Sequence, residues 1–214
     1  MFNTISNDSY ILSIYQYIAD NPDDNCIASH DIAHIKNVVH TIQSVLQQLD
    51  FDDKTIENAK IAAFLHDIGM KHGKRDHAQK SYEMAREYFT DNLINTGANE
   101  EILEAIKYHS NGLENNFIAS ALAFADKLDI KYTRITELGK REKGNRQYYY
   151  IYNIVVKVTS NNLKVMFLVD NKCNKQELEE YYFTKKVFKA ITNFAKIINR
   201  TPLIYFNDNE WILE

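Results

Sequence analysis

The sequence contains few residues that interrupt helices and few that could cross-link the chain. Two prolines and six glycines occur in 214 residues, which favours long helices joined by short connections. The two cysteines, Cys26 and Cys173, are far apart and too few for a disulfide framework. Because disulfides mark oxidising compartments, we expect the protein to work in the reducing cytoplasm.

Membrane-spanning segments and basic stripes are also missing from the sequence. No apolar run reaches the length of a transmembrane helix, and the first residues lack the basic region and apolar stretch of a signal peptide. The net charge is −4 without a strongly basic stripe, so we expect neither a membrane nor a nucleic acid as partner. The hydrophobic fraction of 45% is that of an ordinary globular protein.

Helical periodicity dominates the sequence as far as residue 138. Apolar residues from Ile35 to Leu49 recur at helical spacing, and Ser29 or Asp31 can cap the start of this segment. The same criteria predict further helices over residues 10–18, 55–67, 77–89, 99–109, 116–129 and 131–138.

The periodicity changes after a charged linker at residues 139–146. Residues 150–158 and 163–169 alternate in polarity on either side of a polar turn, which is typical of a β-hairpin. A long helix is expected over residues 175–199, and residues 203–206 could form a short third strand.

These patterns predict a mainly α protein. We expect a helical-bundle domain at residues 1–138, followed by a small α+β appendage at residues 147–214.

The adjacent pair His66-Asp67 is the strongest functional signal in the sequence. It lies at the end of an apolar helical run, where a buried carboxylate needs a partner or a cation. Adjacent helix residues point about 100° apart, so both side chains can flank one ion only where the helix ends. Gly69 supplies such an end.

Further candidate ligands lie on other predicted helices: His34, His77, His109 and Asp126. Small and apolar residues surround Asp126 in the sequence, so close helix packing would bury its carboxylate. Imidazoles and carboxylates on facing helices are the groups with which helical bundles bind divalent metals.

This arrangement resembles the signature of the HD-domain metal-dependent phosphohydrolase superfamily: a histidine, then a His-Asp doublet, then a distant aspartate. His34, His66-Asp67 and Asp126 match it in order and in helical context. The segments Phe64–Gly69 and Ala123–Asp129 look like the doublet and closing motifs of the family. The resemblance covers roughly residues 25–135 and does not reach the hairpin.

The resemblance also implies a ligand set. One ion would be bound by His34, His66, Asp67 and Asp126. Some members of the family hold a second ion, and here Asp67 would bridge to it while His77 and His109 bind it. Imidazole with carboxylate suits manganese, iron, zinc, cobalt or nickel, so we expect one or two of these ions as cofactors.

The activity implied is that of a phosphohydrolase, in which a metal-activated water attacks a phosphate ester or anhydride. Asp67 would bridge the ions and orient the water, and the expected partner is a small-molecule phosphate, in particular a nucleotide. The extra motif of the cyclic-dinucleotide branch is missing, as is the acidic pair that follows the doublet in alarmone hydrolases. The identity of the substrate therefore stays open.

Two cations near the predicted ligands are candidates for binding substrate phosphate. Lys71 follows the doublet, and Arg134 lies beyond the closing aspartate, where its guanidinium could fork onto a phosphate. Each is explained equally well as a solvated surface residue. His30, one helical turn before His34, could support the ligands, whereas His40 and His72 are read as ordinary packing or surface residues.

Two other classes of function remain open. A regulatory module would bind a nucleotide without turning it over. An interaction protein would pair the exposed edge of the hairpin with another chain, for example in a homodimer. Turnover of phosphate compounds distinguishes an enzyme from both.

Overall fold

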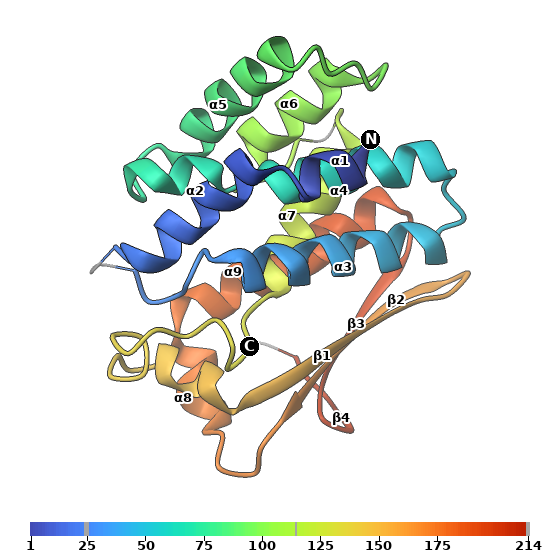
Figure 1. The fold of residues 1–214 in the computed structure, drawn as a ribbon. Helices are drawn as coiled ribbons and strands as arrows, with labels where there is room; N and C mark the ends of the chain where they lie inside the picture. Colours follow the sequence, from blue (N-terminus) through green and yellow to red (C-terminus); the bar gives the residue numbers. More distant parts are fainter. Residues whose placement is uncertain (24–25, 114, 213–214) are drawn as a thin grey trace. The chain divides into compact units, whose positions relative to one another are not determined.

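The computed structural model describes residues 1–23, 26–113 and 115–212. Within these, the chain divides into two compact units. A helical unit comprises residues 1–23 and 30–126, and a C-terminal unit comprises residues 26–29 and 127–212 (Figure 1). From the sequence we expected domains at residues 1–138 and 147–214. That these two segments fold independently stays a prediction.

The helical unit is built from helices of 5 to 17 residues, shorter than the long helices that the scarcity of proline and glycine favoured. Its elements are α1 (Phe2–Ser6), α2 (Ser9–Asp20), α3 (Ile32–Gln48), α4 (Asp53–Leu65), the 3-10 helix η1 (Ile68–His72), α5 (His77–Asp91), α6 (Asn99–Tyr108) and α7 (Phe117–Leu128).

Aspartate side chains start three of these helices. Asp8, Asp31 and Asp52 each accept hydrogen bonds from two backbone N–H groups in the first turn of α2, α3 and α4. Such caps satisfy N–H groups that have no partner within the helix. Of the two caps considered for α3, Asp31 is the one observed, which fixes the start of the helix that carries His34.

The core of the helical unit is formed by the apolar stripes that the periodicity identified. The stripe of α3 is buried at positions such as Ile35, Val38 and Ile42, and this helix packs against α4. Helices α5 and α6 lie side by side, and α6 also contacts α4 (Figure 1). As a result, the C-terminal ends of α4 and α6 and the N-terminal end of α5 come close together within the unit.

The C-terminal unit contains a mixed sheet and two helices. Its elements are the 3-10 helix η2 (Asn145–Tyr150), strands β1 (Ile151–Val158) and β2 (Asn162–Val169), helices α8 (Lys175–Glu180) and α9 (Tyr182–Ile197), and strands β3 (Thr201–Phe206) and β4 (Asn209–Glu210). The strand order is β1-β2-β3-β4; β1 and β2 form the predicted antiparallel hairpin. Strand β3 is parallel to β2, and α8 and α9 provide the crossover that a parallel pair requires.

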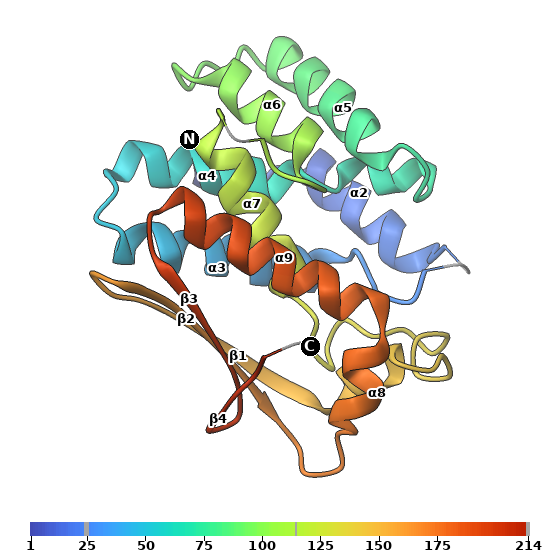
Figure 2. The same ribbon diagram turned by 180° about the vertical axis from the view of Figure 1, so that it is seen from behind.

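One face of this sheet packs against α9 (Figure 2). Alternate residues of β2, from Leu163 to Val169, are buried, as expected for a strand with one face in a core. The buried Trp211 closes this core, because its ring packs edge-on against Phe167, Phe188 and Phe206.

The predicted fold class, a mainly helical protein with an α+β appendage, is confirmed, although only the first unit is built mainly from helices. The expected helix over residues 131–138 is wrong. Those residues form turns, because their backbone instead bonds to residues 27–29: Ser29 N–H donates to Arg134 O at 2.7 Å, and Ala28 bridges to Ile135.

The single long helix expected over residues 175–199 is also wrong, since it is two helices with a break at Tyr181. The backbone of Tyr181 is extended, with φ −78° and ψ 128°. Its side chain packs against Gly144, where an added Cβ would lie 2.6 Å from the Cβ of Tyr181. This close contact, together with the positive φ of Gly144, needs a glycine at position 144. Strand β4 was not predicted.

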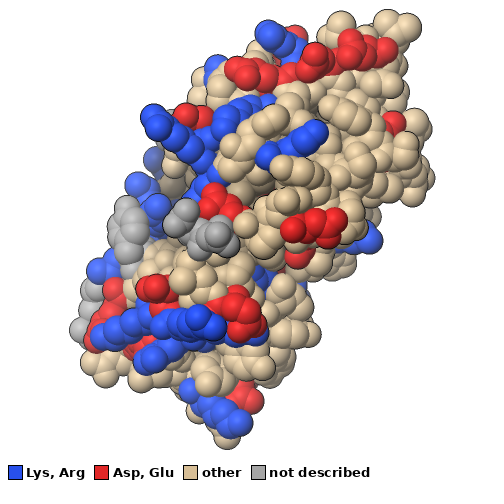
Figure 3. Space-filling view, turned by 60° about the vertical axis from the view of Figure 1, so that its left-hand side comes forward, with Lys and Arg blue, Asp and Glu red and all other residues tan. Residues whose placement is uncertain are grey.

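The polarity of the helices and the surface charges can be compared with the composition. Within the described residues, every helix is too short or too polar to cross a bilayer. On the face shown in Figure 3, the described basic and acidic side chains lie close together in several places rather than forming one basic stripe.

Candidate metal centre

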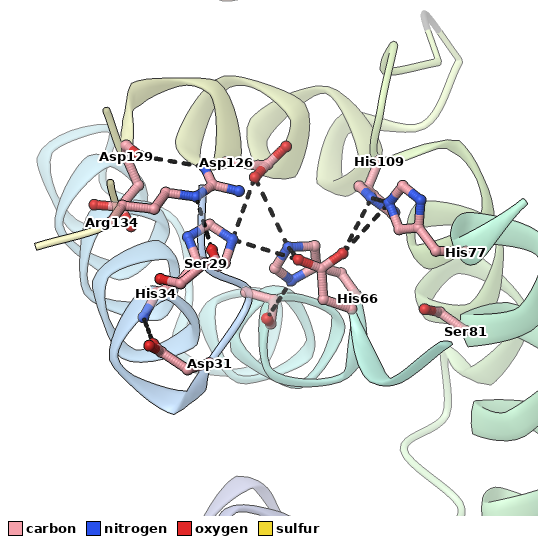
Figure 4. Close-up of polar contacts among 12 residues, drawn as sticks. Ser29, Asp31, His34, His66, His77, Ser81, His109, Asp126, Asp129 and Arg134 are labelled. Carbon is pink, nitrogen blue, oxygen red and sulfur yellow. Dashed lines mark hydrogen bonds and ion pairs between the residues drawn. The ribbon is translucent and has the colours of Figure 1, made fainter. Parts of the chain in front are cut away.

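The structure brings the six predicted ligands together inside the helical unit (Figure 4). They come from five stretches of chain: His34 on α3, His66 and Asp67 directly after α4, His77 at the start of α5, His109 directly after α6, and Asp126 on α7.

The first group of ligand atoms is deeply buried. Nε2 of His34 lies 3.5 Å from Oδ2 of Asp67 and 3.4 Å from Oδ1 of Asp126. Nε2 of His66 lies 3.2 Å from the same Asp67 oxygen and 3.9 Å from the same Asp126 oxygen. Two nitrogens and two oxygens therefore surround one small volume, which suits a divalent transition metal.

The second group shares Asp67 with the first. Oδ1 of Asp67 lies 3.5 Å from Nε2 of His77 and 3.6 Å from Nε2 of His109. One carboxylate oxygen thus faces each group. The arrangement has the form of two adjacent cation sites joined by a bridging aspartate. The ligand atoms of His34, His66 and Asp67 lie within 4.8 Å of one another, as do those of Asp67, His77 and His109, so each set could hold one ion.

Backbone contacts fix the tautomer of three imidazoles. Nδ1 of His66, His77 and His109 lies 2.8, 2.9 and 2.7 Å from the carbonyl oxygen of the residue three positions earlier. A carbonyl only accepts, so Nδ1 carries the proton and Nε2 presents a lone pair to the centre. This is the usual way in which a protein orients histidine ligands.

These lone pairs give a test of whether the residues fit a metal. Nε2 of His66 and Oδ2 of Asp67 are buried and have no hydrogen-bond partner among the described residues. Nε2 of His77 and of His109 lie only 3.1 Å apart, although both rings have their proton on Nδ1. Acceptors that face one another at such distances repel unless a cation lies between them. The donor set therefore fits divalent metal ions.

The protonation states also suit metal binding. Burial, together with the nearby His66, lowers the pKa of His109 to about 3, which keeps its imidazole neutral. Burial alone would raise the pKa of Asp67, but the adjacent imidazoles of His66 and His34 outweigh it and hold the pKa well below its usual range. Positive charge is thus what keeps the Asp67 carboxylate ionised, and a divalent cation supplies it when the imidazoles are neutral.

The end of α4 positions the doublet, as the sequence suggested, but the expectation that Gly69 ends this helix is wrong, because Gly69 lies within η1. The regular helix stops at Leu65, and Asp67 adopts φ −113° and ψ 10°, which separates its side chain from that of His66. A Cβ on Gly69 would lie 2.3 Å from the carbonyl oxygen of His77 and 2.5 Å from the amide nitrogen of Ser81. Glycine at this position lets the chain after the doublet touch α5.

The two predicted phosphate-binding cations are placed differently. Lys71 is exposed on η1, and its ammonium lies 5.8 Å from the ring centre of Tyr17. Arg134 belongs to the C-terminal unit and is buried; its Nε and Nη1 donate to the carbonyl oxygens of Ser29 and Asp129, each at 3.2 Å. The catalytic roles of both residues stay predictions.

Two residues near the ligands, Tyr15 and Ser81, had no assigned role in the sequence, whereas His30 was suggested as a support for the ligands. The Tyr15 hydroxyl donates to the carbonyl oxygen of Phe64, two residues before the doublet. Burial together with the Asp67 charge raises the pKa of Tyr15 well above its usual value. His30 is half-buried, with ring centres 5.9 Å from His34 and 6.4 Å from His77. Buried Ser81 accepts a hydrogen bond from the Gly69 N–H. The only sequence signal for Ser81 is its position one helical turn after His77.

Comparison with known proteins decides the family. The sequence model of the HD domain matches residues 30–147, more than half of the chain and all six candidate ligands. The chain belongs to the HD-domain family. HD domains bind divalent metals, and the family is one of metal-dependent hydrolases.

Similarity was also found among solved structures, but not among curated proteins. No curated protein matches the chain. A solved structure from an uncultured Thermotogales bacterium, described as a predicted HD superfamily hydrolase, is 26% identical to it. The match covers 60% of this chain and 78% of that protein, with a TM-score of 0.46.

Proposed function

We propose that this HD-domain protein is a metal-dependent phosphohydrolase with two divalent ions in its centre. The observation that carries the proposal is the Asp67 carboxylate, which directs one oxygen to each of two buried ligand groups. The first ion would be bound by His34, His66 and Asp126, and the second by His77 and His109. Asp67 would bind both.

Bound ions would supply Lewis acidity for phosphate oxygens and an activated water as nucleophile. Residues of the chain orient the metal ligands and balance charge. The imidazoles of His66, His77 and His109 direct lone pairs inward because their Nδ1 protons are held by backbone carbonyls. Asp67, kept ionised, provides the negative charge that orients the nucleophile, and Lys71 and Arg134 are the proposed counter-charges for the substrate phosphate.

The substrate that we propose is a phosphate ester or anhydride of a small molecule, in particular a nucleotide. The two adjacent cation sites support phosphate, since paired divalent ions balance the charge of a phosphoryl group in transfer to water. The nucleotide part rests on the resemblance alone. The expected cytoplasmic location, the absence of a nucleic-acid partner and a homodimer through the hairpin edge stay predictions.

A metal-dependence experiment tests the proposal. Protein stripped with chelator and reloaded with Mn²⁺ should hold two ions per chain by elemental analysis. It should then release phosphate or pyrophosphate from at least one compound in a panel of nucleoside mono-, di- and triphosphates and simple phosphate esters. His66→Ala should lower this turnover by about 10²–10³-fold. Saturable nucleotide binding without turnover by the loaded wild-type protein would instead favour the regulatory module, and a chain that binds no metal would contradict both.

A further inference from the structure

The contact between the chain after the doublet and the first turns of α5 has no role in the proposal above. It joins the two parts of the chain that carry Asp67 and His77. Gly69 follows Asp67 by two residues, and the N–H of Met70 donates to Asp67 O at 2.9 Å, so the turn that holds Asp67 includes Gly69.

A single buried hydrogen bond fixes the register of this contact. The Gly69 N–H donates to Oγ of Ser81 at 2.9 Å, and Ser81 is fully buried. Figure 4 shows Ser81 on the same side of the centre as His77. Since an added Cβ on Gly69 would collide with His77 O and Ser81 N, the two backbones approach as closely as they can. A buried N–H that loses its acceptor is costly, so this bond resists displacement of α5 along the turn.

His77 needs such support more than the other ligands do. Its side chain is 21% exposed, against 2% for His109 and 0% for His34 and His66. Asp76, which precedes it, adopts a left-handed backbone with φ 57° and makes no side-chain cap to α5. The start of α5 is therefore held by its contacts with the preceding turn rather than by burial or by a cap.

Ser81 lies one helical turn after His77 on the same helix, so a shift of Ser81 moves His77 with it. We propose that Ser81 is a positioning residue for the second ion: by accepting the Gly69 N–H, it holds the His77 imidazole at the distance from Asp67 that the ion requires. This inference rests on the two-ion centre proposed above. The ligands of the first ion other than Asp67 lie on α3, after α4 and on α7, and do not depend on this bond.

Titration of stripped protein with MnCl₂ tests the inference, because isothermal calorimetry gives the affinity of each ion and electron paramagnetic resonance separates a coupled Mn²⁺ pair from an isolated Mn²⁺. In Ser81→Ala, the dissociation constant of the second ion should rise about 10–100-fold, as for other residues that orient metal ligands. The dissociation constant of the first ion should change by less than about threefold. The spectrum at low Mn²⁺ should be that of an isolated ion, and excess Mn²⁺ should restore the pair signal.

Matched variants separate positioning from general stability. Ser81→Cys keeps the shape of the side chain but replaces Oγ with a larger, weaker acceptor, so the affinity for the second ion should again fall. This variant carries the test if Ser81→Ala does not fold. Lys80→Ala removes a neighbouring, more exposed hydrogen bond between α5 and η1, in which Lys80 Nζ donates to His72 O at 3.0 Å. This variant should leave the affinity for both ions unchanged.

The outcomes are distinct. Unchanged affinity for the second ion in both Ser81 variants, an equal loss of both ions, or an equal loss in Lys80→Ala would each overturn the role of Ser81. A wild-type protein that binds fewer than two ions would show instead that the two-ion centre itself is wrong, and the inference would fall with it.

Discussion

The two halves of the metal centre contain similar ligands but differ in burial and support. The half formed by His34, His66 and Asp126 is enclosed, with side-chain exposures of 0%, 0% and 9%. The half formed by His77 and His109 opens on the His77 side, where 21% of the side chain is exposed. Affinity depends on how firmly ligands are held as well as on which ligands they are. We therefore expect the first ion to be held tightly and the second to exchange.

Removing the group common to both halves should have the largest effect. Asp67→Asn keeps the shape of the side chain but replaces the carboxylate that faces both groups with an amide that carries no charge. We expect kcat/KM for a phosphate substrate to fall by at least about 10³-fold, because the bridge and the charge are lost together. Steady-state kinetics and elemental analysis measure the effect, and a variant that keeps two ions and full activity would remove the distinction between shared and separate ligands.

Removing one ligand from each half should separate the halves. His66→Ala takes a fully buried ligand and should lower activity about 10²–10³-fold at any Mn²⁺ concentration. His77→Ala takes a half-buried one and should lower it about 10–100-fold, with partial recovery in excess Mn²⁺. Activity measured across a Mn²⁺ series decides this, and the halves would be equivalent if both variants respond alike.

Chelators should remove the ions in order. A weak chelator is expected to take the second ion first, leaving one per chain, whereas a strong chelator removes both. Because bound ligand stabilises the folded state, loss of the enclosed ion should lower the melting temperature by about 5–10 °C. Calorimetric scans with parallel elemental analysis test this order, which would be reversed if the exposed half bound more tightly.

A smaller effect is expected from an ion pair in the C-terminal unit, far in sequence from the ligands. Glu177 is bound by the Arg146 guanidinium through two hydrogen bonds of 2.8 and 2.7 Å and by the Gly144 N–H, and these contacts lower its pKa to about 2. Glu177→Gln should cost about 1–2 kcal/mol of unfolding free energy at neutral pH and leave metal binding unchanged.

The pH dependence of this pair has a definite sign. The depressed pKa means that the ionised Glu177 stabilises the fold above its ordinary pKa of 4.5, and that this stabilisation is lost as pH falls from 4.5 towards 2. The difference between wild type and Glu177→Gln in urea unfolding should therefore shrink over that range. Glu180→Gln, which breaks an exposed pair with Lys143, is the control and should cost less than about 0.5 kcal/mol.

The sequence predicted what depends on local pattern and residue chemistry. The helix stripes, the Asp31 cap and the hairpin follow from periodicity and side-chain type, and all six candidate ligands lie at one centre. The resemblance, rather than spacing, supplied the division of those ligands into two groups. The structure shows that division as two faces of one carboxylate.

The features that could not be predicted depend on contacts between distant residues. Residues 131–138 have helical spacing, yet their backbone bonds to residues 27–29. At the break, Tyr181 packs against Gly144, which is distant in the sequence, and the parallel pairing of β2 with β3 joins strands separated by two helices. Ser81 belongs to the same class, because only the fold shows that a serine on α5 receives the N–H of a glycine after the doublet.

The ligands are spread along the chain in a way that bears on biosynthesis. His34 lies near the start of the helical unit, whereas Asp126 lies on α7 at its end. A nascent polypeptide on the ribosome therefore cannot complete the enclosed half until α7 has emerged from the exit tunnel. We therefore expect loading of that ion to be a late event of synthesis, after which the metal would link α3 to α7, the last helix of the unit.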